Sequence, residues 1–147
     1  MMRRRAFLLV AMAAAMTDLP AFAQEAARLN PNTATAEQLA RLPGLSATLA
    51  DAVVRQRPFA SIVEFNALVR QTLSEAQATS VYESLFIPVN LNTGTTAQIT
   101  FIPGMTARMI REFLEYRPYR DIETFNREMG KYVNQAEVAR LRSYVTL

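Results

Sequence analysis

The hexapeptide Leu-Pro-Gly-Leu-Ser-Ala at residues 42–47 recurs sixty residues later as Ile-Pro-Gly-Met-Thr-Ala at residues 102–107. The same offset places residues 30–35 on residues 90–95, and the Arg-Pro-aromatic tripeptide at 57–59 on the one at 117–119. Residues 30–87 align with residues 90–147 without a gap. A repeat that stays in register over this length indicates duplicated structure, so both copies are expected to contain the same elements in the same order.

Each copy carries signals that begin and end short helices. Capping boxes are predicted at Thr35 with Gln38 and at Thr95 with Gln98. The Pro-Gly pair then ends the first helix of each copy, because Pro lacks an amide donor and Gly tolerates a positive φ. Apolar residues keep helical spacing and no segment alternates with a period of two, so the sequence predicts an all-α fold without a β-sheet. The expected caps of the later helices are Ser46, Ser61 and Ser74 in the first copy and Thr106, Asp121 and Asn134 in the second.

The first 23 residues are typical of a signal peptide. Three arginines precede an apolar run at residues 6–16, and Ala21-Phe22-Ala23 provides a cleavage site of the small-x-small kind. An eleven-residue helix is too short to span a hydrocarbon core of about 30 Å. We therefore expect cleavage before Gln24 and a periplasmic or secreted bacterial protein. A retained membrane anchor is the alternative, and the general secretory and twin-arginine routes are both compatible with these residues.

Composition narrows the chemistry that the chain can perform. It has no Cys and no His, so it lacks a thiolate nucleophile, the commonest general base and the usual zinc ligands. We accordingly expect no enzyme, no cofactor, no metal site and no small-molecule substrate. Residues 1–23 hold three of the 16 basic residues and one of the 13 acidic ones, which lowers the formal net charge from +3 to +1 after cleavage. Overall charge is therefore weak evidence for a polyanionic partner.

The Asn-Thr opening, the Leu-Pro-Gly turn and the apolar helix that follows resemble the helix-hairpin-helix motif. The fuller pattern of each copy resembles the tandem module of the ComEA-type competence DNA receptor family. That resemblance implies two helix-hairpin-helix modules (SAM-like helical bundles) at residues 24–89 and 90–147, which contact the DNA backbone outside the cytoplasm without sequence preference. The pattern is also similar to the extrinsic PsbU subunit of photosystem II, which implies the alternative of a docking protein whose hairpins bind a protein partner.

The resemblance also indicates where contact with DNA is expected. A tight turn before a helix presents backbone amides at the positive end of the helix dipole, where a phosphate can bind. In the family a second glycine follows in the turn, but this chain has Ser46 and Thr106 there. Each hydroxyl either caps its own helix, and so occupies the anion site, or donates to a phosphate oxygen. The candidate contact residues for DNA or a protein partner are Gly44, Leu45, Ser46 and Ala47 in the first copy and Gly104, Met105, Thr106, Ala107, Arg108 and Arg111 in the second.

The distribution of charged residues predicts that the second copy makes most of the contact with DNA. Arg108 and Arg111 are three residues apart and share a helix face, whereas the corresponding helix of the first copy has no cation in its first turn. Residues 90–147 carry eight basic and six acidic residues, against five and six in residues 24–89. Further cations extend the predicted contact surface, unless they are ordinary solvated charges: Arg117, Arg120, Arg127 and Lys131. The choice between DNA and a protein partner and the oligomeric state stay open.

Overall fold

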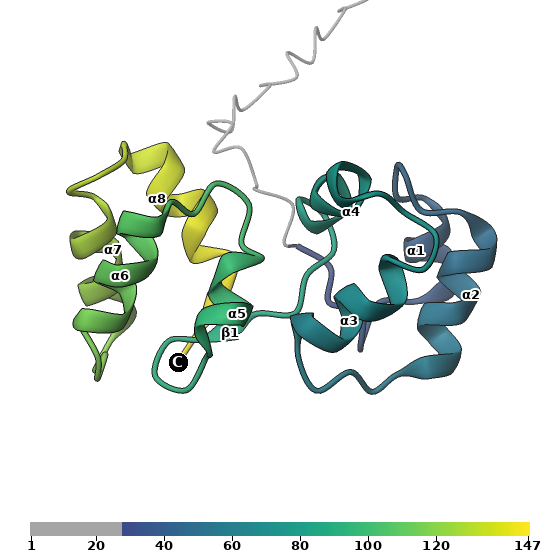
Figure 1. Ribbon diagram of the computed structural model, residues 1–147, viewed down its shortest axis with the longest axis horizontal. Coiled ribbons are helices and arrows are strands. Elements are labelled where there is room, and N and C mark those ends of the chain that lie inside the picture. Colours follow the sequence, from purple (N-terminus) through teal and green to yellow (C-terminus); the bar gives the residue numbers. More distant parts are fainter. Residues whose placement is uncertain (1–27) are drawn as a thin grey trace, which may run out of the picture.

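The computed structural model describes residues 28–147, which form eight helices and one small sheet. The predicted signal peptide at residues 1–23 lies outside the described residues. The first helix set consists of α1 (Ala36–Ala40), α2 (Ala47–Gln56), α3 (Ile62–Val69) and α4 (Glu75–Tyr82). The second helix set consists of α5 (Thr96–Thr100), α6 (Ala107–Glu115), α7 (Ile122–Met129) and α8 (Gln135–Arg142). The two sets lie side by side along the long axis of the molecule (Figure 1).

The predicted caps are confirmed at all eight helices of the described residues. Thr35, Thr95 and Ser74 each form a complete capping box with a Gln three residues later. Corresponding helices begin sixty residues apart, so both copies of the repeat have the same order of helices. The remaining caps are the expected Ser46, Ser61, Thr106, Asp121 and Asn134.

The mostly helical fold is confirmed, but the expectation of a fold without a sheet needs a correction. β1 (Val89–Asn90) pairs in parallel with β2 (Val145–Thr146), which joins the beginning of the second copy to its end. In the first copy a single parallel bridge joins Leu29 and Leu85, at the positions sixty residues earlier. Strands of two residues are too short to show an alternating pattern, and their partners are distant in sequence, so no local signal predicted them.

Two side chains hold the opening loop of each copy against the turn that follows its second helix. The Asn92 side chain accepts a hydrogen bond from the Tyr119 amide at 2.7 Å and donates one to the Tyr119 carbonyl at 2.9 Å. Arg117 donates to the carbonyls of Leu91 at 2.7 Å and Gly94 at 2.6 Å. Because these bonds connect segments more than twenty residues apart, they order the loop that precedes the first helix. The same roles in the first copy belong to Asn32 and Arg57.

Aromatic contacts join the two helix sets. The rings of Tyr82 and Phe101 lie 6.1 Å apart, and those of Phe86 and Tyr144 lie 4.8 Å apart, both with edge-to-face geometry. The Arg28 guanidinium lies 3.5 Å from the centroid of the Tyr144 ring. The two sets therefore pack against each other through a shared apolar core. No helix within residues 28–147 has the length and apolar character needed to cross a membrane.

Candidate functional site

Both hairpin turns have the geometry that their Pro-Gly pairs predict. The Leu45 amide donates to the Leu42 carbonyl at 3.3 Å, and the Met105 amide donates to the Ile102 carbonyl at 3.2 Å. The glycine between them has φ +81° in the first turn and +83° in the second. Pro followed by a residue of positive φ is the pattern of a type II turn, in which only Gly is free of strain. Each turn reverses the chain between a short helix and a longer one.

The hydroxyl groups after the glycines act as helix caps. Ser46 accepts a hydrogen bond from the Leu49 amide, and Thr106 accepts one from the Met109 amide, both at 3.2 Å. Of the two roles that the sequence left open, the structure therefore shows the capping one. The caps leave the amides of the first two residues of each helix without a partner among the described residues, since a helix offers them no acceptor. In α6 these amides belong to the exposed residues Ala107 and Arg108.

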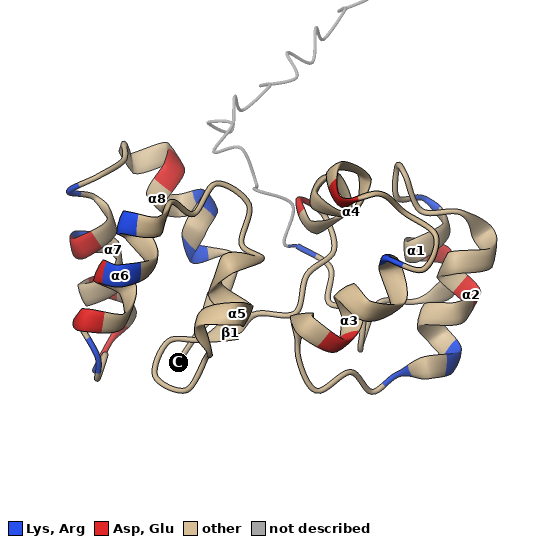
Figure 2. Cartoon of the chain, in the orientation of Figure 1, with Lys and Arg blue, Asp and Glu red and all other residues tan. Residues whose placement is uncertain are grey.

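The second hairpin carries the cations that the sequence predicted for it. Arg108 and Arg111 both lie on α6 and are exposed. In the first helix set, α2 has a single basic residue, Arg55, in its last turn and far from the hairpin. The drawing of charged positions shows this difference between α6 and α2 (Figure 2). A positive helix end with cations in its first turns is a site where an anion is favoured.

Arg140 on α8 contacts the second hairpin turn, and the sequence did not predict this contact. Its Nη2 donates to the Pro103 carbonyl at 2.6 Å, and its guanidinium pairs with Glu137 at 2.5 and 2.8 Å. Glu137 is the main reason that the pKa of Arg140 is raised. The turn itself gives no signal for a partner 37 residues away. A comparison of the two copies does give a signal, because Arg140 is a cation of the second copy whose corresponding residue in the first copy is the uncharged Ser80.

The turn of the second hairpin also lines a cavity between the two helix sets. This cavity has a volume of about 460 Å³ and is open to solvent. Two arginines and one glutamate line it together with the exposed Gly104. Its lining residues are Arg28, Glu83, Pro103, Gly104, Arg140 and Tyr144.

Three of the four further cations make contacts within the protein. Arg117 is engaged by the loop carbonyls described above. Lys131 and Arg127 both pair with Glu128, whose side chain is 5% exposed. Lys131 is the largest cause of the lowered pKa of Glu128. Arg120 is exposed and stays a candidate.

The first hairpin presents a more neutral surface. Gly44, Ser46 and Ala47 are exposed, while the side chain of Leu45 is buried in the core. The nearest basic residue in the sequence is Arg41, which caps the C-terminus of α1 and is exposed. Leu45 therefore contributes packing and a backbone amide to the turn, and no accessible side chain.

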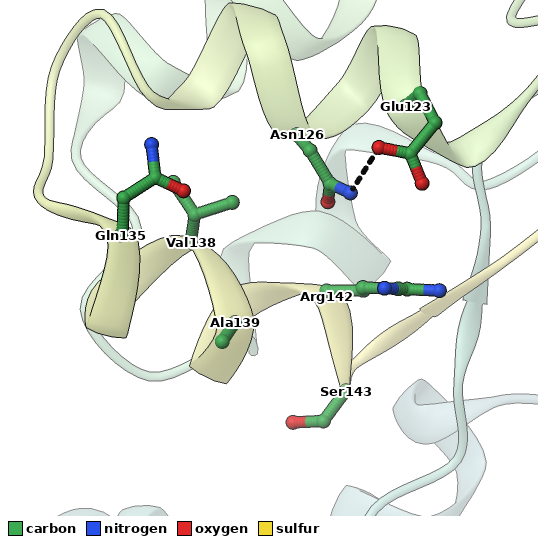
Figure 3. Close-up of a pocket in the computed structure, with 7 residues that line it drawn as sticks. All are labelled: Glu123, Asn126, Gln135, Val138, Ala139, Arg142 and Ser143. Atoms are coloured by element: carbon green, nitrogen blue, oxygen red, sulfur yellow. Dashed lines mark hydrogen bonds between the residues drawn. The ribbon is translucent and has the colours of Figure 1, made fainter.

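A separate cavity of about 510 Å³ lies between α7 and α8 (Figure 3). Asn126 on α7 donates to Glu123, but its buried side-chain oxygen has no hydrogen-bond partner among residues 28–147. In the first copy the corresponding Asn66 oxygen accepts a hydrogen bond from the Tyr82 hydroxyl at 2.7 Å. The position of Tyr82 is occupied by the exposed Arg142 in the second copy, so this hydrogen bond is a difference between the copies. Its lining residues are Glu123, Asn126, Gln135, Val138, Ala139, Arg142 and Ser143.

Comparison with known proteins identifies the motif in the first copy. Residues 24–70 match the family model of the helix-hairpin-helix motif, a motif that commonly binds nucleic acids. This range contains α1, the first hairpin, α2 and α3. No solved structure matches the chain.

Curated relatives are similar over a longer part of the chain. A bovine protein (Bos taurus) named endonuclease/exonuclease/phosphatase family domain-containing protein 1 is 29% identical over 161 aligned residues. The proteins of the same name from rat (Rattus norvegicus) and human (Homo sapiens) are each 30% identical. In each case the match covers 80% of this chain and 28% of the relative, so the chain spans little more than a quarter of their length.

These relatives contradict the expectation that the protein is not an enzyme. Their name contains a family of endonucleases, exonucleases and phosphatases, and the match to them extends over most of this chain. The expectation rested on the absence of Cys and His, which excludes only those mechanisms that need these two side chains.

Proposed function

We propose that this protein binds the sugar-phosphate backbone of DNA without sequence preference, through two tandem helix-hairpin-helix modules at residues 24–89 and 90–147. The hairpin of the second module is the main contact. One observation carries the proposal: the amides of the exposed residues Ala107 and Arg108 lie at the positive end of α6 without a partner among residues 28–147, and the exposed cations Arg108 and Arg111 lie on the same helix. Such an arrangement favours a phosphate group.

The geometry of the second hairpin explains why the protein would bind DNA without recognising its base sequence. Backbone amides and guanidinium groups at a helix end recognise phosphate oxygens, which are the same at every nucleotide. Base edges are read by side chains that enter a groove, and the hairpin presents Gly104, Thr106 and Ala107 at its exposed tip. These residues are small, so they allow close approach to a backbone but reach no base edge.

Two comparisons support this proposal. The helix-hairpin-helix motif matched at residues 24–70 is commonly one that binds nucleic acids. The relatives carry a name that includes endonucleases and exonucleases, for which a nucleic acid is a fitting ligand. A chain that holds a DNA backbone fits both findings, and the repeat extends the same role to the second copy.

A salt titration tests the proposal. For duplex DNA, the logarithm of the affinity should fall with the logarithm of the salt concentration at a slope of about −0.9 per neutralised phosphate. Replacing both Arg108 and Arg111 with Ala should flatten that slope by up to about two. The replacement of Thr48 with Ala, at the position that corresponds to Arg108 in the first copy, is the matched control and should leave the slope nearly unchanged. A wild-type protein that shows no salt-sensitive binding at low ionic strength would exclude DNA and favour a protein partner for the hairpins.

We further propose that residues 1–23 direct the protein out of the cytoplasm. The support is the order of three features in the sequence: a cluster of arginines, an apolar run and the Ala21-Phe22-Ala23 site. A DNA ligand would then be met in the periplasm or outside the cell.

A further inference from the structure

The fold brings together Arg108 and Tyr132, which are 24 residues apart in the sequence. The guanidinium carbon of Arg108 lies 4.8 Å from the centroid of the Tyr132 ring. A cation within about 6 Å of a ring centroid is attracted by the negative charge of the ring face. Arg108 lies in the first turn of α6, directly after the second hairpin, and Tyr132 lies in the turn between α7 and α8. The contact therefore links the proposed DNA site to another part of the second module.

Tyr132 is the better-fixed member of this pair. Its amide donates to the Met129 carbonyl at 2.9 Å, and its ring is half-buried against the apolar core. Partial burial and a hydrogen-bonding contact with the Glu112 carboxylate raise the pKa of its hydroxyl group. Arg108, by contrast, is an exposed side chain with several freely rotating bonds. The ring is therefore the support and the guanidinium is the group that it holds.

The first copy lacks both members of the pair. The positions that correspond to Arg108 and Tyr132 are Thr48 and Thr72. Thr48 is exposed in the first turn of α2, and Thr72 is exposed in the turn before α4. Since the two copies share their helices, caps and turns, the cation and its aromatic support are a specific addition to the second hairpin.

We propose that Tyr132 is a positioning residue for DNA binding: its ring holds the guanidinium of Arg108 beside the exposed amides of α6, ready to meet a phosphate. This inference rests on the proposed function. An arginine that is already held in place loses less rotational freedom when it binds, so more of its attraction for phosphate appears as affinity. Tyr132 itself is not expected to touch DNA.

Two substitutions at residue 132 distinguish the effect of the aromatic ring from the effects of side-chain size and of the hydroxyl group. Tyr132→Leu keeps an apolar side chain in the core but removes the ring, whereas Tyr132→Phe keeps the ring. The probe is a fluorescently labelled duplex of about 20 base pairs, with affinity measured by anisotropy on the full chain between about 50 and 200 mM salt. Tyr132→Leu should weaken binding by about three- to tenfold, and Tyr132→Phe should stay within about twofold of wild type.

The salt slope and a double substitution show whether Tyr132 acts through Arg108. Arg108→Ala removes a charge, so it should flatten the slope by about one, whereas Tyr132→Leu leaves the charge and should change the slope much less. The double variant Arg108→Ala with Tyr132→Leu should bind like Arg108→Ala alone, because the ring then has nothing to position. Thr72→Leu, at the corresponding position of the first copy, is the matched control and should bind like wild type.

A measurement without DNA separates the failure of this inference from that of the proposed function. The Arg108 Nε–H proton should show an upfield ring-current shift in the NMR spectrum of wild type and Tyr132→Phe, and lose it in Tyr132→Leu. Losses of affinity that add up in the double variant, or a Tyr132→Phe variant as weak as Tyr132→Leu, would overturn the positioning role. A protein that keeps the ring-current shift but binds no DNA would overturn the proposed function, and the role of Tyr132 with it.

Discussion

The two hairpin glycines provide a matched pair of substitutions, because they have the same backbone conformation but different neighbours. Gly44 and Gly104 both have a positive φ, so replacing either one with Ala should cost about 1–2 kcal/mol of folding free energy. A Cβ atom added at Gly44 would lie 3.7 Å from Val81, which is an ordinary contact. A Cβ atom added at Gly104 would lie 2.7 Å from Nη2 of Arg140 and would displace that guanidinium.

This displacement gives the Gly104→Ala variant a second cost. The guanidinium would leave the Pro103 carbonyl, to which Nη2 donates at 2.6 Å. A hydrogen bond to a charged group contributes about 1.5–3 kcal/mol. The Arg140 side chain is 27% exposed and water replaces part of the lost bond, so we expect about 1 kcal/mol. Gly104→Ala should therefore destabilise the protein by about 2–3 kcal/mol, against about 1–2 kcal/mol for Gly44→Ala.

Urea denaturation followed by circular dichroism measures both costs. In the background of Arg140→Ala the guanidinium is absent, so Gly104→Ala should cost no more than Gly44→Ala does. The coupling between the two sites should accordingly be about 1 kcal/mol, well above the error of about 0.3–0.5 kcal/mol for independent sites. Equal costs for Gly44→Ala and Gly104→Ala in the wild-type background, or additive effects of Gly104→Ala and Arg140→Ala, would refute this account of the second turn.

Three further predictions concern the opening loop, a buried carboxylate and the N-terminus. Asn92→Ala should destabilise the fold by about 1–3 kcal/mol in urea denaturation, since it removes both hydrogen bonds to the backbone of Tyr119. The hydrogen bond with Lys131 is the largest cause of the lowered pKa of Glu128 in the folded state. The ion pair of Glu128 therefore stabilises the fold above the pKa that this carboxyl group has in the unfolded chain. This stabilisation is lost as the pH falls through the folded-state pKa. Unfolding measured from pH 7 to pH 3 should therefore show a shallower acid-side loss of stability in Glu128→Gln than in wild type, and an unchanged pH dependence would contradict this. Mass spectrometry of the protein from the producing cell should find Gln24 as the first residue and the protein outside the cytoplasmic membrane; an intact Met1 on a cytoplasmic form would contradict export.

Local sequence signals predicted the helices and turns of both copies. Each cap, capping box and Pro-Gly turn depends on residues within four positions of one another, where side chain and backbone meet whatever the rest of the chain does. The offset of sixty residues extended these predictions from one copy to the other. The second hairpin was therefore predictable from the sequence, and the structure places Arg108 in the first turn of α6 and Arg111 three residues later on the same helix.

Composition, in contrast, was a poor guide to function. The absence of Cys and His argued against an enzyme, and the relatives contradict that expectation. The absence of a residue type excludes only those mechanisms that use its side chain. Since the chain spans 28% of these relatives, the residues responsible for their chemistry need not lie in the matched part.

The sequence by itself determined the order of the helices, their caps and the positive φ of Gly44 and Gly104, because these depend on neighbours along the chain. Only the tertiary structure decided which charges are free to bind a partner. It placed Arg140 on the carbonyl of Pro103 and Arg108 against the ring of Tyr132. It also closed the second copy by pairing β1 with β2. All these contacts join residues from different elements, and whether a charge is solvated or paired depends on what the fold packs beside it.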